Sequence, residues 1–293
     1  FSSAYSAPKS AGLWREEGGG MTEARTPDLR VINLGAGVQS TTLILMAARG
    51  EFDVIPDCAI FADTQWEPKA VYEHLDWLER EVGHIIPIYR VTKGNIRQAC
   101  LESKNGKRFA ALPFHVRNPD GKGGMLRRQC TREYKIEPIN RKIRELLGFK
   151  PRQRITKTVE QWFGISIDEA FRMRDSRYPW AINRYPLVEK DMTRWDCVLW
   201  LQRNGYPVPM KSACIGCPFH DDRYWRDMRD NRPEEWADAV DFDRQIRTGL
   251  RGVLNEAYLH RSLVPLDQVD LSTDRDYGQL DLFEMECEGM CGV

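Results

Sequence analysis

The sequence lacks the features that would direct it to a membrane or give it a strong overall field. No run approaches the roughly 18 to 20 apolar residues of a bilayer span, and residues 1–20 hold no apolar core of a secretory signal. Its 43 basic and 43 acidic residues cancel, so no global charge attracts nucleic acid. We therefore expect a cytoplasmic protein without membrane contact. Its 293 residues suffice for one α/β domain and a smaller appended one.

The eight cysteines are poor disulfide candidates, because the cytoplasm keeps thiols reduced. Their spacing therefore bears on metal or redox chemistry. Cys214 and Cys217 are two residues apart, a spacing at which two thiolates can bind one metal centre. Cys58 in an apolar strand and Cys197 on an apolar helix face indicate ordinary buried cysteines, and Cys100 has no partner at a useful spacing.

Strand and helix patterns alternate through residues 29–205. Strands are predicted near 30–34 and within 55–64, 84–91 and 156–170, and helices over 67–83, 136–149 and 191–205. This order predicts an α/β, Rossmann-like fold: a mostly parallel sheet with helices on both faces and a ligand site at the carboxyl ends of the strands.

Three further segments complete the predicted organisation. Residues 1–28 are expected to be a disordered leader, and 105–124 a long mobile loop. Residues 206–293 are predicted to form a smaller helical region with the Cys-x-x-Cys pair, an amphipathic helix over 233–247 and a cysteine-bearing tail.

The turn GAGVQS at residues 35–40 joins the first strand to an apolar helix. Small residues let backbone N–H groups approach a ligand, and the helix N-terminus behind them carries a partial positive charge. The turn therefore favours phosphate binding. An ordinary tight turn between strand and helix is the alternative.

Basic residues are concentrated between residues 121 and 157, where twelve Lys and Arg face three Glu. This imbalance predicts a local anion-attracting surface. Arg127, Arg128 and Arg132 are its candidate phosphate contacts for a nucleic acid, tRNA or DNA. A solvated helix face with ordinary charge bias is the alternative.

Five segments together resemble a known family. They are GAGVQS (35–40), FADTQWEP (61–68), CTREYKIEP (130–138), GISIDEAFR (164–172) and PLVEKDMTRWDCVLWL (186–201). In this order they resemble the phosphoadenosine-phosphosulfate reductase family of the adenine-nucleotide α-hydrolase (PP-loop) superfamily, over about residues 30–220.

The resemblance implies binding of ATP or a related adenine nucleotide. The implied nucleotide-binding residues are Gly35, Gly37, Gln39, Ser40, Thr41, Asp63 and Thr64, and the implied substrate-binding residues are Arg127, Arg128, Arg132, Lys135, Asp168 and Arg172. Gln39 stands where the superfamily's turn carries Asp, which removes one Mg²⁺ contact. Nucleotide binding is therefore a firmer expectation than Mg²⁺-dependent hydrolysis of ATP.

The resemblance also implies a [4Fe-4S] cluster held by Cys130, Cys214 and Cys217, with Thr131 in place of a second cysteine beside Cys130. Three protein thiolates would leave one iron open for sulfide or substrate. A zinc site on Cys214, Cys217, Cys287 and Cys291 is the alternative, for which His220 is an additional candidate ligand.

The tail ECEGMCGV resembles the Glu-Cys-Gly tail in which family reductases carry their nucleophile. Cys287 is therefore the candidate catalytic cysteine, with Cys291 as a second thiol for a disulfide or persulfide, and a frayed end is the alternative.

The leading functional hypothesis is ATP-dependent, iron-sulfur-dependent thiolation, with a nucleic acid as an acceptor. Reduction of an adenylyl sulfate is the first rival, and a non-catalytic nucleotide or nucleic-acid binder the second. The assembly stays open, with a homodimer as one option.

Overall fold

Five parallel strands form the central sheet of the structure, a computed structural model that describes residues 26–106, 108–118 and 121–272. Their order is β3-β2-β1-β6-β7. The strands are β1 (Leu29–Leu34), β2 (Cys58–Asp63), β3 (Ile88–Thr92), β6 (Val159–Phe163) and β7 (Ala181–Arg184). The chain runs outward from β1 to β3 and then returns to the other side of β1, which creates a switch point between β1 and β6.

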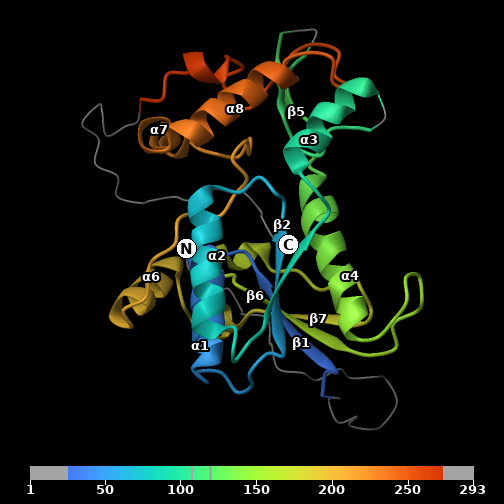
Figure 1. Cartoon of the computed structure of the whole chain (residues 1–293), viewed down its shortest axis with the longest axis vertical. Helices are drawn as coiled ribbons and strands as arrows, with labels where there is room; N and C mark the ends of the chain where they lie inside the picture. Colours follow the sequence, from blue (N-terminus) through green and yellow to red (C-terminus); the bar gives the residue numbers. More distant parts are fainter. Residues whose placement is uncertain (1–25, 107, 119–120, 273–293) are drawn as a thin grey trace, which may run out of the picture.

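Helices cover both faces of this sheet, which confirms the predicted α/β fold (Figure 1). The helices α1 (Val38–Ala48), α2 (Lys69–Val82), α5 (Pro186–Glu189) and α6 (Arg194–Arg203) pack on one face, and α4 (Glu137–Leu146) packs on the other. Successive strand residues point to opposite faces, so Ile32 meets the first group and Val31 meets α4. None of the described helices has the length and apolar character needed to cross a membrane.

Local signals located several of these elements. The capping box at the start of α6 is present, with the Thr193 hydroxyl accepting from the Asp196 N–H at 3.1 Å and the Asp196 carboxylate accepting from the Thr193 N–H at 2.9 Å. Strand β7 is an addition that the sequence patterns did not predict. It is only four residues long, and in the sequence AINR the exposed Ile182 follows the buried Ala181, so its pattern is weak.

A second lobe lies above the sheet in Figure 1 and includes α3 (Ile96–Leu101), α7 (Asp222–Asn231) and α8 (Pro233–Ile246). Its small antiparallel sheet has the order β5-β4-β8, with β4 (His115–Arg117), β5 (Gly123–Met125) and β8 (Ala257–Tyr258). The short helical turns are η1 (Glu102–Asn105), η2 (Thr131–Ile136), η3 (Ile167–Arg172) and η4 (Leu266–Gln268).

The prediction of a long mobile loop over 105–124 is wrong for its middle part. Residues 110–114 are buried, Phe114 completely, and β4 follows directly. Phe114 packs in one apolar cluster with Trp225 and Phe242. The second lobe is therefore built from two distant segments, residues 96–134 and 214–271, which share this core. The residues that pack against this buried segment lie far away in the sequence, so a local pattern does not reveal them.

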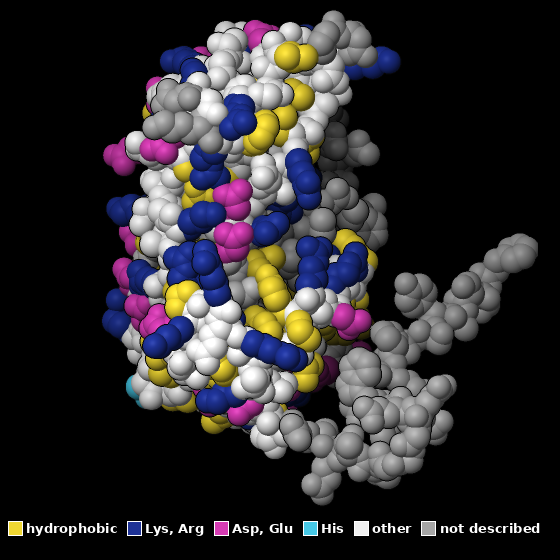
Figure 2. Space-filling model, turned by 90° about the vertical axis from the view of Figure 1, so that its right-hand side faces the viewer, with side chains coloured by type: hydrophobic (Ala, Val, Ile, Leu, Met, Phe, Trp, Pro, Cys, Tyr) yellow, Lys and Arg dark blue, Asp and Glu magenta, His cyan; other side chains and the backbone are white. Residues whose placement is uncertain are grey.

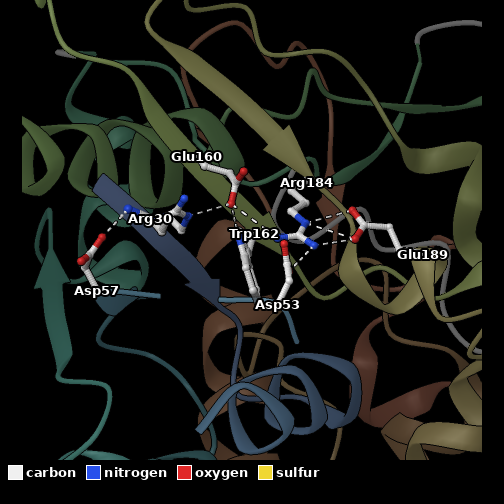
Figure 3. Close-up of polar contacts among 7 residues, drawn as sticks. All are labelled: Arg30, Asp53, Asp57, Glu160, Trp162, Arg184 and Glu189. Atoms are coloured by element: carbon white, nitrogen blue, oxygen red, sulfur yellow. Dashed lines mark hydrogen bonds and ion pairs between the residues drawn. The ribbon is translucent and has the colours of Figure 1, made fainter. Parts of the chain in front are cut away.

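An ion-pair network crosses the sheet between β1, β6 and the loops beside them (Figure 3). Arg184 donates to Asp53 and Glu189 at 2.8 to 3.1 Å, and its guanidinium lies 4.7 Å from the centre of the Trp162 ring. The hydrogen bond from Arg184 holds the pKa of Asp53 below its usual value. Trp162 in turn donates to Glu160, at 2.6 Å. The network ties the edge strand β7 to the centre of the sheet.

Candidate functional site

A cavity of about 160 Å³ lies at the switch point between β1 and β6. Its walls come from the turn after β1, the loop after β6, and residues 211–220 below the second lobe. The two loops touch: a Cβ added at Gly164 would lie 2.8 Å from the Ser40 nitrogen. This is the position at which open parallel sheets bind their ligands. We call this cavity the switch-point pocket.

The N-terminus of α1 faces this pocket. Gly37 is its N-cap residue, no side-chain cap is present among the described residues, and the first turn contains no acid. The Ser40 hydroxyl instead closes the turn, accepting from the Gly35 N–H at 3.3 Å and donating to the Gly37 carbonyl at 3.2 Å. Ala36 has φ 56°, a left-handed conformation that tightens the turn. The first N–H groups of α1 therefore form an anion-binding end.

Four cationic side chains line the same pocket: Lys135, Arg172, Arg194 and Lys211. They come from η2, η3, α6 and the segment before the Cys-x-x-Cys pair. Glu169 is the one acidic side chain among the described residues that line the pocket. It accepts from Arg172 at 2.6 Å and from the Gln39 amide at 3.1 Å. The excess of positive charge suits a group with several negative charges, such as a polyphosphate.

The far end of the pocket holds a thiol and a neutral imidazole. Cys217 and His220 both line it. His220 Nε2 lies 2.9 Å from the Cys214 carbonyl, which can only accept, so Nε2 carries the hydrogen. The other ring nitrogen, Nδ1, is buried without a hydrogen-bond partner in the described chain. Burial lowers the pKa of His220 to about 3, and the ring is uncharged at neutral pH.

Cys214 lies behind the pocket in a buried polar group with Thr64 and Glu67. Thr64 donates to Glu67 Oε1 at 2.9 Å, and its hydroxyl lies 3.2 Å from Cys214 Sγ. Burial raises the pKa of Glu67. The pKa of the Cys214 thiol is also raised, mainly by burial and secondly by the negative charge of Glu67. Gly216 lets this turn pack closely against Trp66, because a Cβ at this position would lie 2.1 Å from the indole ring.

The donor set expected for an iron-sulfur cluster is not assembled. Within residues 26–272, outside the short gaps, no three His, Cys, Asp or Glu side chains are grouped so as to hold a metal ion. Cys130 packs against the core of the second lobe, where its N–H donates to Ala111 at 2.9 Å. Cys287 and Cys291 lie outside the described residues. The cluster and the zinc alternative both stay predictions, and no step below uses either.

The structure brings part of the predicted site together. The predicted residues that line the pocket are Gly35, Gly37, Gln39, Ser40, Lys135, Arg172 and Cys217. Thr41 lies elsewhere, completely buried, with its hydroxyl 2.9 Å from His74 Nε2. Asp63 accepts from the Gln65 N–H and the Tyr72 hydroxyl, and Asp168 accepts from the Arg194 N–H at 3.1 Å.

The three arginines predicted to contact nucleic-acid phosphates lie outside the pocket lining. Arg127 is exposed, Arg128 lies over the Phe219 ring at 5.3 Å, and Arg132 pairs with Glu137 at 3.3 Å. Among the titratable side chains that line the pocket, sequence reasoning missed four as pocket residues: Glu169, Arg194, Lys211 and His220. Position offers a weak signal for two of them, because Glu169 follows Asp168 and Lys211 shortly precedes the Cys-x-x-Cys pair.

No family model and no curated protein matches the chain. Among solved structures, the chain is similar to the crystal structure of phosphoadenylyl-sulfate (PAPS) reductase from Candida auris, in its phosphate complex. The two chains are 13% identical, the match covers 61% of this chain and 74% of the other, and the TM-score is 0.40.

Proposed function

We propose that the chain is an enzyme that binds an adenine nucleotide in the switch-point pocket and uses it for sulfur transfer. One observation carries the proposal: an uncapped helix N-terminus, four cationic side chains and the Cys217 thiol meet in a single cavity. The first two features suit a polyphosphate, and the third places a potential sulfur carrier beside it.

The cationic side chains and the helix N-terminus of this open cavity suit the phosphate groups of the nucleotide. The phosphates would lie against the first N–H groups of α1, with Lys135 and Lys211 balancing their charge. The nucleoside would extend over the apolar wall formed by Phe61, Ile139 and Phe163. Glu169 is the carboxylate through which Mg²⁺ would be held beside the phosphates, in the role that Gln39 cannot fill.

The proposed reaction has two bond exchanges. An oxygen of the acceptor attacks the α-phosphorus of ATP, the bond to pyrophosphate breaks, and the acceptor becomes adenylylated. Hydrosulfide then attacks the activated carbon, and the C–O bond breaks with release of AMP. Cys217 would take the outer sulfur of an external persulfide donor, whose own thiol leaves. A second thiol would then attack the Cys217 sulfur and release hydrosulfide by forming a disulfide with it, and an external dithiol would reduce this disulfide before the next turnover. The unpartnered Nδ1 of His220 offers a hydrogen-bond acceptor in the same pocket as Cys217.

Reduction of an adenylyl sulfate is the second candidate. The nearness of a thiol to a cationic pocket supports it, because a thiolate could attack the sulfate sulfur while the nucleotide leaves. The product decides between the two candidates: thiolation gives AMP and pyrophosphate from ATP when acceptor is present, whereas reduction gives sulfite. A chain that binds nucleotide and forms neither product would be a binder.

Calorimetric titration with ATP, ADP and AMP tests the binding step. We expect affinity to fall in that order, because the cations and the helix end bind phosphates. Lys211→Ala should weaken ATP binding about tenfold, the effect of one charge-assisted contact. Gly37→Val should weaken it further, since a branched side chain would cover the helix end.

Arg203→Ala is the matched control, because it removes one positive charge from the exposed C-terminal end of α6, away from the pocket. Its ATP affinity should equal that of the unchanged chain. Equal affinity in Lys211→Ala and Gly37→Val would instead show that the nucleotide does not bind in the switch-point pocket.

A further inference from the structure

A second hollow runs along the outer face of α4, on the opposite face of the sheet from α1 and α2. Its volume is about 670 Å³. We call it the α4 groove. It is lined by Glu137, Asn140, Arg141, Arg144 and Glu145 of α4, Phe149, Pro151 and Arg152 of the following loop, and Tyr178 and Trp180 before β7. Figure 2 views the molecule from the side where α4 lies in Figure 1, and Lys and Arg side chains gather there around an apolar strip.

The groove carries uncompensated positive charge. Its two acids are engaged by bases outside its lining: Glu137 pairs with Lys93 and Arg132, and Glu145 pairs with Lys142. Arg144 donates to the Gln153 carbonyl, a neutral acceptor. Arg141 and Arg152 are exposed and have no ion-pair partner among the described residues. The three guanidinium groups therefore face the groove with no carboxylate bound to them.

Aromatic rings line the same hollow. Phe149 and Trp180 are partly buried and pack against the core beneath α4, which fixes their position. Tyr178 is 37% exposed, and its ring centre lies 5.2 Å from that of Trp180 at an interplanar angle of 31°. An exposed ring supported by a second ring, with arginines beside it, suits the stacking of unpaired bases.

The groove and the switch-point pocket both include residues from the region where α4 begins. Lys135 and Ile139 line the pocket, while Glu137 and Asn140, their neighbours at the start of α4, line the groove. The ten residues of α4 rise about 15 Å. At roughly 3.4 Å per stacked nucleotide, this length accommodates about four nucleotides.

We propose that the α4 groove binds a single-stranded segment of a polynucleotide and leads one of its nucleotides to the switch-point pocket. The arginines would contact phosphates and Tyr178 would stack on a base. Single strands are favoured over duplexes because paired bases do not offer their faces to a side chain. The inference rests on the proposed function only in naming the polynucleotide as the acceptor; the groove itself is a separate site.

Fluorescence anisotropy with labelled 12-nucleotide single-stranded RNA, single-stranded DNA and a DNA duplex tests the groove. We expect the single strands to bind more tightly than the duplex. Tyr178→Ala should weaken single-strand binding about tenfold. Arg141→Ala with Arg152→Ala should lower the slope of log affinity against log salt by about 1.4, the value for two lost phosphate contacts to a single strand.

The matched control is Arg80→Ala with Arg203→Ala, which removes the same charge from exposed positions on α2 and α6, across the sheet from α4. It should bind as the unchanged chain does. Wild-type affinity in both groove variants, or absence of strand binding at low salt, would overturn the proposal. A change in the molecular mass of the groove variants in solution would also overturn it, by showing that the groove contacts a second copy.

Calorimetry with ATP on the same variants keeps the two proposals apart. The groove variants should bind ATP normally. If the unchanged chain binds single strands but does not bind ATP, the proposed function is refuted and the proposal for the groove is retained.

Discussion

We predict that protonation of His74 lowers the free energy of unfolding as the pH drops below 6.5. Its ring is half-buried on α2, stacks on Trp77 with ring centres 5.2 Å apart, and lies 2.9 Å from the hydroxyl of Thr41, which follows the glycine turn at residues 35–40. Burial lowers the pKa of His74 from 6.5 to about 4. The folded state therefore holds a neutral ring where the unfolded chain binds a proton, and the stabilisation is complete above pH 6.5 and is lost between about pH 6.5 and 4.

The size of the effect follows from these two pKa values. Between pH 7 and pH 5 the linkage relation gives a loss of about 2 kcal/mol from His74 alone. Because the ring is only half-buried, we expect about 1 to 2 kcal/mol. His74→Gln keeps an acceptor for Thr41 but has no titrating ring. Its unfolding free energy should be lower at pH 7, because the stacking on Trp77 is lost, yet should change less between the two pH values.

Urea denaturation followed by tryptophan fluorescence, in reducing buffer at pH 7 and pH 5, measures this difference. The other titrating groups, His115 and His220 among them, contribute equally to both proteins and cancel. His84→Gln, at an exposed histidine, is the control and should behave like the unchanged chain. An equal loss of stability in His74→Gln and the unchanged chain would refute the assignment of a buried neutral ring.

Three further predictions concern other parts of the structure. Gly164→Ala should lower ATP affinity at least tenfold by calorimetry, because its Cβ would lie 2.8 Å from the Ser40 backbone and displace the start of α1; unchanged affinity would contradict the close approach. Arg184→Leu should lower the unfolding free energy in urea by about 1 kcal/mol, because it removes the ion pairs of this largely buried guanidinium with Glu189 and with the exposed carboxylate of Asp53; a change within experimental error would show that the network adds nothing. Iron and sulfide analysis after anaerobic purification tests the cluster prediction, which is an alternative to the persulfide role of Cys217: a cluster on the three thiols requires iron in the unchanged chain and less of it in Cys130→Ala, Cys214→Ala and Cys217→Ala, and full iron in Cys130→Ala would exclude that ligand.

Several parts of the fold were open to prediction from the sequence because their causes are local. A buried β-branched run followed by Gly35 and Gly37 predicts a strand, a tight turn and a helix start within a few residues. Thr193 and Asp196 mark the start of α6 within the helix predicted over 191–205, since a capping box needs only neighbouring backbone groups. Alternating strands and helices then predicted parallel pairing and the edge of the sheet at which the switch-point pocket lies.

Other features depended on contacts between segments far apart in the sequence. The Gln39 amide meets Glu169, 130 residues away, and Cys217 with His220 reaches the turn at Gly37 because the second lobe lies against the carboxyl edge of the sheet. Residues 110–114 form a short apolar run without periodicity inside a loop-like segment, and they are buried because the apolar faces of α7 and α8 pack against them.

The sequence by itself therefore determined four of the five strands of the central sheet, the helices between them and the glycine turn at residues 35–40, since backbone geometry and side-chain periodicity act within about one helix or strand. Only the tertiary structure decided which of the predicted ligand-binding residues share a site. It placed Lys135, Arg172 and Cys217 in the pocket and left Arg127 and Thr41 outside it. The physical reason is that burial of apolar surface fixes how distant segments pack, and polar side chains meet where that packing brings their elements together.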